Sequence, residues 1–135
     1  ARASFYRNFD SIDNVINLII DEATDEMVED VFPLLTSSDE RKWREFLFNH
    51  FYRFKKHQKD MQKMCLENIA MIFTKINSQI LQKEMSTQSE TIQDKYLVIG
   101  KWGLINNILR KWIDTGANET PEEMIDYIMS FITKF

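Results

Sequence analysis

Apolar residues recur at intervals of three and four positions through most of the chain. One face of an α-helix repeats about every 3.6 residues, so this pattern predicts helices over 12–32, 43–56, 64–84, 92–114 and 121–135. Only three glycines and two prolines occur in 135 residues, which favours long uninterrupted helices over a β-rich fold with many tight turns. We therefore expect one all-α domain of about five or six helices.

Short polar motifs predict where these helices begin and end. Ser37–Glu40 has the capping-box form Ser-x-x-Glu, and Thr87–Glu90 offers a similar cap to the helix at 92–114. The sequence Thr-Pro-Glu-Glu at 120–123 combines an N-cap, a proline at the first helical position and a capping-box glutamate. It is the strongest helix start in the chain. Gly116 is placed to end the preceding helix.

The last two predicted helices are apolar over more of their circumference than one core requires. Apolar residues cover roughly half of the 92–114 helix, whereas packing on a single core needs a stripe of about 100°. Gly100 and Gly103 lie one turn apart on it, which favours close approach of another helix; a kink is the alternative. We therefore expect a second copy of the chain as the partner. The residues predicted for this interface are Val98, Trp102, Ile105, Leu109, Trp112, Met124, Ile125, Ile128, Phe131 and Ile132.

The composition is that of a soluble globular domain. Hydrophobic residues make up 44% and charged residues 28%, and the net charge of −4 gives no overall attraction to nucleic acid. No apolar run approaches the roughly 18 to 20 residues needed to cross a bilayer. The single cysteine, Cys65, cannot form a disulfide within the chain, which suits a reducing compartment. We expect a cytoplasmic protein without membrane contact.

Motifs for catalysis or metal binding do not occur. The chain has no Gly-rich phosphate loop, no nucleophile elbow and no paired His-Glu metal motif, so we expect neither an enzyme nor a cofactor. His50, His57 and Cys65 lack a standard ligand spacing. We interpret His57 as a surface residue and Cys65 as a small buried side chain, and we expect no metal.

Two features leave alternatives open. His50 lies within an aromatic stripe from Trp43 to Phe54, where it is either a satisfied core histidine or a polar contact in a small-molecule pocket lined by aromatic side chains. The basic run from Arg41 to Lys63 is interrupted by apolar residues at helical spacing. It indicates a solvated face, with contact to nucleic acid as the alternative.

Both ends of the chain resemble the TetR family of bacterial transcription regulators. The segment SFYRNFDSIDNV at 4–15 resembles the end of their helix-turn-helix domain, where a recognition helix ends in Thr/Ser-hydrophobic-Tyr-x-x-Phe. The succession of Gly103, Trp112, Gly116 and 120–123 resembles the closing helix pair of the group that includes regulators similar to the dihydroxyacetone-kinase coactivator. The middle, 33–91, is similar in helical character alone.

This resemblance implies a division of the chain into two parts. Residues 1–10 would be a remnant of the DNA-binding domain, and 11–135 an effector-binding and dimerisation domain: a TetR-like helical bundle with its last two helices in a four-helix dimer interface. Ile12 stands where the family commonly has a lysine, and the first helices of the DNA-binding domain are absent. Operator binding is therefore expected from the full-length protein alone. The DNA-contacting positions implied are Arg2, Ser4, Tyr6, Arg7 and Asn8.

The function implied is that of a transcriptional regulator, expected to be a repressor, controlled by a small-molecule effector. The effector would occupy a cavity between 12–32, 43–56, 64–84 and 92–114 and change the pitch of the first of these helices. The alternative is a coactivator that binds a partner protein and no small molecule, with a filled core. From helical faces, the residues expected at the effector are Phe46, His50, Phe51, Cys65, Ile69, Phe73, Trp102 and Asn106.

Overall fold

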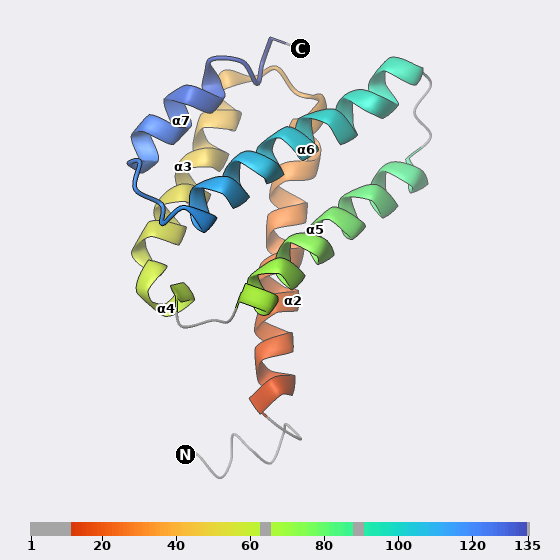
Figure 1. The fold of residues 1–135 in the computed structure, drawn as a ribbon. Helices are drawn as coiled ribbons and strands as arrows, with labels where there is room; N and C mark the ends of the chain where they lie inside the picture. The colour runs from red at the N-terminus through yellow and green to blue at the C-terminus, as the bar shows by residue number, and fades with distance from the viewer. Residues whose placement is uncertain (1–11, 63–65, 88–90, 135) are drawn as a thin grey trace.

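A computed structural model describes residues 12–62, 66–87 and 91–134, and this part of the chain is all-α (Figure 1). Its elements are α2 (Ile12–Val31), the short 3-10 helix η1 (Phe32–Thr36), α3 (Glu40–Lys56), α4 (Gln58–Gln62), α5 (Leu66–Ser86), α6 (Ile92–Asp114) and α7 (Pro121–Met129). No strand occurs in the three described ranges, so the predicted all-α character is confirmed. None of the described helices is long and apolar enough to cross a membrane.

The helices pack in two groups, α2 with α5 and α6, and α3 with α7. The groups meet where Phe51 and Phe54 of α3 pack on Trp112 of α6. α5 and α6 lie side by side as a long hairpin, and α2 packs against α5 (Figure 1). α3 packs along α7, while η1 contacts both α2 and α6. Four helices, α2, α3, α5 and α6, thus surround one space.

Three tryptophans form the centre of the core. Trp43, Trp102 and Trp112 are almost completely buried. The Nε1 of Trp43 donates to the carbonyl of Ser37 at 2.8 Å, and that of Trp112 donates to the carbonyl of Glu119 at 3.1 Å. These indoles therefore fix the loops at the start of α3 and before α7 while their rings fill the core.

Two of the predicted helix caps are wrong. Asp39, not Ser37, caps α3: its Oδ1 accepts from the Lys42 amide at 3.2 Å. A carboxylate caps as well as a hydroxyl and adds a favourable interaction with the helix dipole, which explains the choice. Thr91, not Thr87, caps α6 by accepting from the Asp94 amide at 3.1 Å.

The predicted ends around the α6–α7 loop are confirmed. Thr120 accepts from the Glu123 amide at 3.2 Å, and Glu123 completes the capping box. Gly116 follows the end of α6 with a φ of 95°, and Ala117 continues in the left-handed region with a φ of 51°. The Ala117 amide donates to the Trp112 carbonyl at 2.8 Å, which closes the helix end.

α7 is shorter than predicted, ending at Met129 rather than at 135. The Phe131 amide bonds to the carbonyl of Ile128, three residues back, and the Ser130 hydroxyl donates to the Tyr127 carbonyl at 2.6 Å. These tighter bonds compete with the α-helical ladder and convert it into a turn.

Among the described residues, no neighbouring helix of the same chain approaches the two glycines of α6. A Cβ atom built on Gly100 or Gly103 would meet no atom of another described helix within 4 Å. The close helix contact expected at these positions is therefore absent from the described part of the single chain.

Candidate ligand cavity

A cavity of about 370 Å³ lies between α2, α3, α5 and α6; we call it the apolar cavity. Its volume is at the lower end of the range of about 300 to 1,000 Å³ that small-molecule sites occupy. Most of its described wall is aliphatic or aromatic, and the polar side chains among these described residues come from the α3 side. The lining residues are Ile20, Ala23, Met27, His50, Arg53, Phe54, His57, Ile69, Ile72, Phe73, Ile76, Leu109 and Ile113.

Helical spacing explains why these residues share one space. α5 contributes positions 69, 72, 73 and 76, and the end of α3 contributes 50, 53, 54 and 57. Both sets follow the i, i+3, i+4, i+7 pattern of a single helix face. α2 adds 20, 23 and 27 in the same way. The wall is thus made of one stripe from each helix, held by the packing of the helices.

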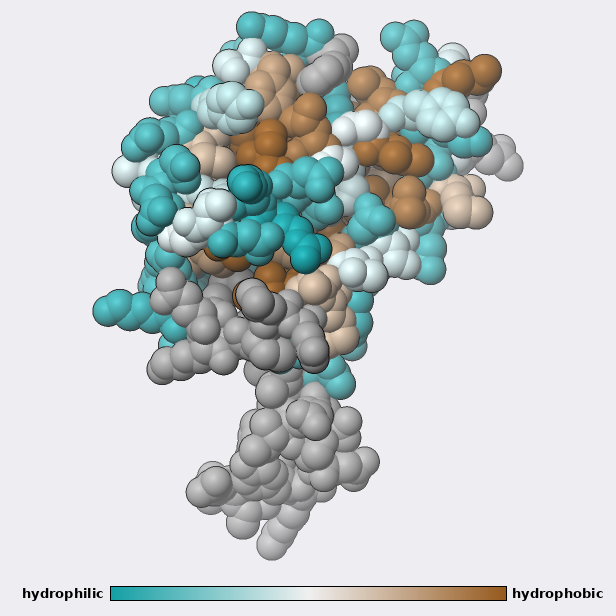
Figure 2. Space-filling model, in the orientation of Figure 1, coloured by the Kyte–Doolittle hydropathy of each residue, from teal (hydrophilic) through white to brown (hydrophobic). Residues whose placement is uncertain are grey.

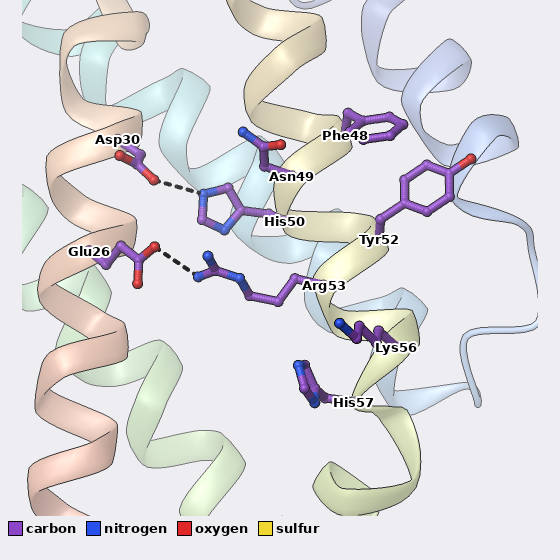
Figure 3. A pocket seen from close by; sticks show the side chains of 9 residues that line it. All are labelled: Glu26, Asp30, Phe48, Asn49, His50, Tyr52, Arg53, Lys56 and His57. Atoms are coloured by element: carbon purple, nitrogen blue, oxygen red, sulfur yellow. Dashed lines mark hydrogen bonds and ion pairs between the residues drawn. The ribbon is translucent and has the colours of Figure 1, made fainter.

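A second hollow, the polar groove, lies between α2 and α3 (Figure 3). It has a volume of about 490 Å³ and shares His50, Arg53 and His57 with the apolar cavity. The residues that line the groove alone are Glu26, Asp30, Phe48, Asn49, Tyr52 and Lys56. The three shared side chains therefore stand at the boundary between an apolar interior and a polar surface.

One ion pair and one histidine–carboxylate contact cross the groove from α3 to α2 (Figure 3). Arg53 Nη1 lies 2.9 Å from Glu26 Oε1, and His50 Nε2 lies 3.3 Å from Asp30 Oδ2. The Arg53 and Glu26 side chains are 56% and 50% exposed, so their pair contributes about 1 kcal/mol at most. The contacts orient the α3 side chains without locking the two helices together.

Burial controls the charge of His50. Its side chain is only 12% exposed, and this burial lowers the pKa of the imidazole below the ordinary 6.5, although the Asp30 carboxylate opposes the shift. Nε2 is buried and makes no aligned hydrogen bond with any described residue. His50 is therefore a neutral polar group at the cavity boundary, which can either donate or accept a hydrogen bond.

Three of the residues expected at the effector line the apolar cavity: His50, Ile69 and Phe73. Phe46 lies one turn before His50, with ring centroids 4.4 Å apart, beside a smaller surface hollow. Phe51 packs on Trp112 in the core, with centroids 4.9 Å apart. Cys65 lies outside the described residues.

Trp102 and Asn106 do not line the cavity, although both face inward from α6. Trp102 Nε1 and Asn106 Oδ1 are buried and have no hydrogen-bond partner among the described residues, as is also true of Thr24 Oγ1. Unsatisfied buried polar atoms cost about 1 to 3 kcal/mol each. These atoms mark the least well satisfied part of the interior.

Sequence reasoning missed Arg53 and His57, which line the cavity. Both were assigned to the solvated side of the basic run. Their spacing from His50, three and seven residues, places them on its face of the helix and was the available signal. A long arginine stem can line an apolar wall while the guanidinium reaches water.

The residues predicted for the dimer interface serve mainly the core of the single chain. Eight of them are buried there: Val98, Trp102, Ile105, Leu109, Trp112, Ile125, Ile128 and Ile132. Met124 and Phe131 are partly buried against that core. A second copy would therefore meet other side chains of α6 and α7, among them the exposed Tyr127. The predicted DNA-contacting residues Arg2, Ser4, Tyr6, Arg7 and Asn8 lie outside the described residues.

No protein-family model, no curated protein and no solved structure matches this chain. The function must therefore be argued from the cavity and its chemistry. In the described ranges no group of three or more His, Cys, Asp or Glu side chains comes together in a way that could hold a metal ion.

Proposed function

We propose that this protein is the effector-binding part of a ligand-controlled transcriptional regulator, a repressor of TetR type, and that the apolar cavity receives the effector. The observation that supports the proposal is the cavity itself, with one apolar stripe from each of four helices and a few polar groups gathered on one side. Convergence of a few polar groups on a mostly apolar hollow is the usual make-up of a small-molecule site.

The effector would control DNA binding by changing the position of α2. This helix contributes Ile20, Ala23 and Met27 to the cavity wall. It contacts α3 through the Arg53–Glu26 ion pair and the His50–Asp30 contact. It also follows directly on the segment that resembles a recognition helix. A ligand that binds better to one position of α2 than to another shifts the equilibrium by that difference in affinity, and by no more.

Thermal unfolding tests the receptor part. A small neutral apolar probe, 1-octanol, should raise the melting temperature of the wild-type chain, because binding to the folded state alone stabilises it. Ala23→Trp should abolish the rise, since Ala23 is an exposed wall residue whose enlargement fills the cavity. Ala70→Trp, on α5 but outside the cavity wall, is the control and should keep it. Absence of any rise with octanol, octanoate or octylammonium would reject the receptor.

A separate experiment tests the regulatory part. The natural full-length protein should retard a fragment of its own genome in gel electrophoresis, and a cavity ligand should change that affinity. A full-length protein that retards no fragment would reject the regulator while leaving the receptor intact.

One observation favours the alternative, a coactivator that binds a partner protein. Apolar side chains are exposed at the free end of the α5–α6 hairpin, where Met85 is 82%, Ile92 78% and Tyr96 62% exposed. Hydrophobic atoms gather over this end of the molecule (Figure 2). Removing them by Ile92→Ser and Tyr96→Ser should weaken a partner complex without changing the melting response to octanol. A response to octanol would distinguish the receptor from this alternative.

A further inference from the structure

The side chains shared by the apolar cavity and the polar groove define what kind of ligand fits both. Building on the cavity proposed above as the effector site, we propose that the ligand is an amphipathic anion. Its apolar body occupies the cavity, and its carboxylate-like head lies at the boundary, among His50, Arg53, His57 and Lys56.

The described ionisable groups in the cavity wall are all basic. They are His50, Arg53 and His57, which project from successive turns at the end of α3 (Figure 3). Among the residues that the structure describes, no carboxylate lines the apolar cavity; Glu26 and Asp30 line the outer groove. A ligand that reaches from the interior toward solvent thus meets nitrogen donors first, and these suit a negative head group.

Arg53 has N–H donors that its contact with Glu26 does not use and that a second carboxylate can accept from. Its contact with Glu26 uses Nη1, and a guanidinium carries five N–H donors in a planar fork. Both partners of the existing pair are about half exposed, so the pair contributes little and a ligand can displace or share it. A carboxylate head can accept two parallel bonds from the fork, which gives orientation as well as affinity.

Lys56 adds a second full positive charge at the groove. It is exposed and pairs with no carboxylate among the described residues, whereas the adjacent Lys55 donates to the Ala117 carbonyl at 2.6 Å. Lys55 therefore holds a loop, and Lys56 is available to a ligand. The two cations of the groove, Arg53 and Lys56, equal in number the two carboxylates, Glu26 and Asp30. Glu26 is paired with Arg53, whereas Lys56 forms no ion pair among the described residues, so its ammonium can contact the head group of a ligand.

The cavity volume limits the apolar body. If each non-hydrogen atom takes about the 30 Å³ of a water molecule, 370 Å³ holds roughly a dozen atoms. A medium-length alkyl chain or a substituted aromatic ring meets this limit, and a long-chain lipid exceeds it.

Three probes with the same tail separate the head group from the body: octanoate, 1-octanol and octylammonium. Isothermal titration of the wild-type chain at neutral pH should give the tightest binding for octanoate, about ten-fold tighter than octanol, and the weakest for octylammonium. Arg53→Gln should reduce the octanoate affinity to that of octanol, and Lys56→Gln should lower it several-fold. Both substitutions should lower octanoate affinity by a larger factor than octanol affinity.

Arg44→Gln is the matched control. Arg44 is also on α3, its side chain is also 56% exposed, and its Nη1 also contacts one carboxylate, that of Asp126 at 3.1 Å, but it lines neither hollow. This variant should bind octanoate as the wild type does.

Each failure has its own meaning. Equal affinity for octanoate and octanol, a preference for octylammonium, or octanoate binding unaffected by both Arg53→Gln and Lys56→Gln would overturn the anionic ligand while the cavity stands. Binding of none of the three probes would overturn the cavity as an effector site together with this inference.

Discussion

His50 Nε2 and Asp30 Oδ2 lie 3.3 Å apart across the α2–α3 groove, yet burial outweighs the carboxylate and lowers the pKa of the histidine. The folded chain therefore binds a proton at His50 less readily than the unfolded chain does. This difference in proton binding at His50 makes the free energy of unfolding depend on pH.

We expect stability to fall on acidification below about pH 6.5, the ordinary pKa of histidine. In that range the unfolded state binds more protons than the folded state, so the free energy of unfolding decreases as the pH is lowered. The charged groups that act on His50 are Asp30 and Glu26, which favour its protonation, and Arg53, which opposes it. Urea unfolding at a series of pH values should show a smaller slope in His50→Gln. Identical slopes in the two proteins would contradict this account.

Phe51 is a core residue, and its truncation should act on stability rather than on ligand selectivity. Its side chain is buried and its ring packs on Trp112. Phe51→Ala should reduce the free energy of unfolding by about 3 to 5 kcal/mol, the usual cost of emptying a buried aromatic site. Phe48→Ala is the control on the same helix, because Phe48 is 51% exposed. A loss below about 1 kcal/mol for Phe51→Ala would place the ring outside the core.

The capping box at the start of α7 should be measurable as an increment of stability. Thr120→Ala removes the hydroxyl that accepts from the Glu123 amide, and should cost about 1 kcal/mol in urea unfolding. Ser38→Ala removes an exposed hydroxyl just before α3 that caps no helix, and should be neutral. Equal effects of the two substitutions would show that the cap does not stabilise α7.

Gly103 offers a test of whether α6 packs closely on a second copy of the chain. A Cβ here meets no neighbouring helix within 4 Å, so Gly103→Ala should stabilise α6 by about 0.5 to 1 kcal/mol. Sedimentation of the variant should match the wild type. A loss of stability together with a fall in mass would show instead that a second copy packs closely on the Gly100–Gly103 face.

The sequence predicted regular elements better than it predicted the cavity. The limits of α6 and the capping box of α7 were predicted correctly because each depends on local chemistry: helical periodicity, Gly116, and Thr120 with Glu123. The cap of α3 was missed because Ser37 and Asp39 can both cap, and the carboxylate of Asp39 adds the favourable interaction with the helix dipole.

The cavity depended on tertiary packing that periodicity does not contain. Phe51 and Phe73 each lie on the apolar face of their own helix, α3 and α5. Phe51 packs on the Trp112 ring, however, whereas Phe73 lines the apolar cavity. Whether an inward side chain meets another side chain or empty space depends on how neighbouring helices cross. Arg53 was missed for a different reason, since a charge on a basic helix is by default assigned to solvent.

The residues at the end of α3 and the start of α4 contact both the apolar cavity and the α6–α7 loop. Arg53 and His57 line the cavity, whereas Lys55 and Gln58 donate to the carbonyls of Ala117 and Gly116, at 2.6 and 2.9 Å. Any ligand that moves this turn must either carry the α6–α7 loop with it or break these two bonds. The Ala117 amide closes α6 through its bond to the Trp112 carbonyl. Its rate of hydrogen exchange should therefore change when a ligand occupies the apolar cavity.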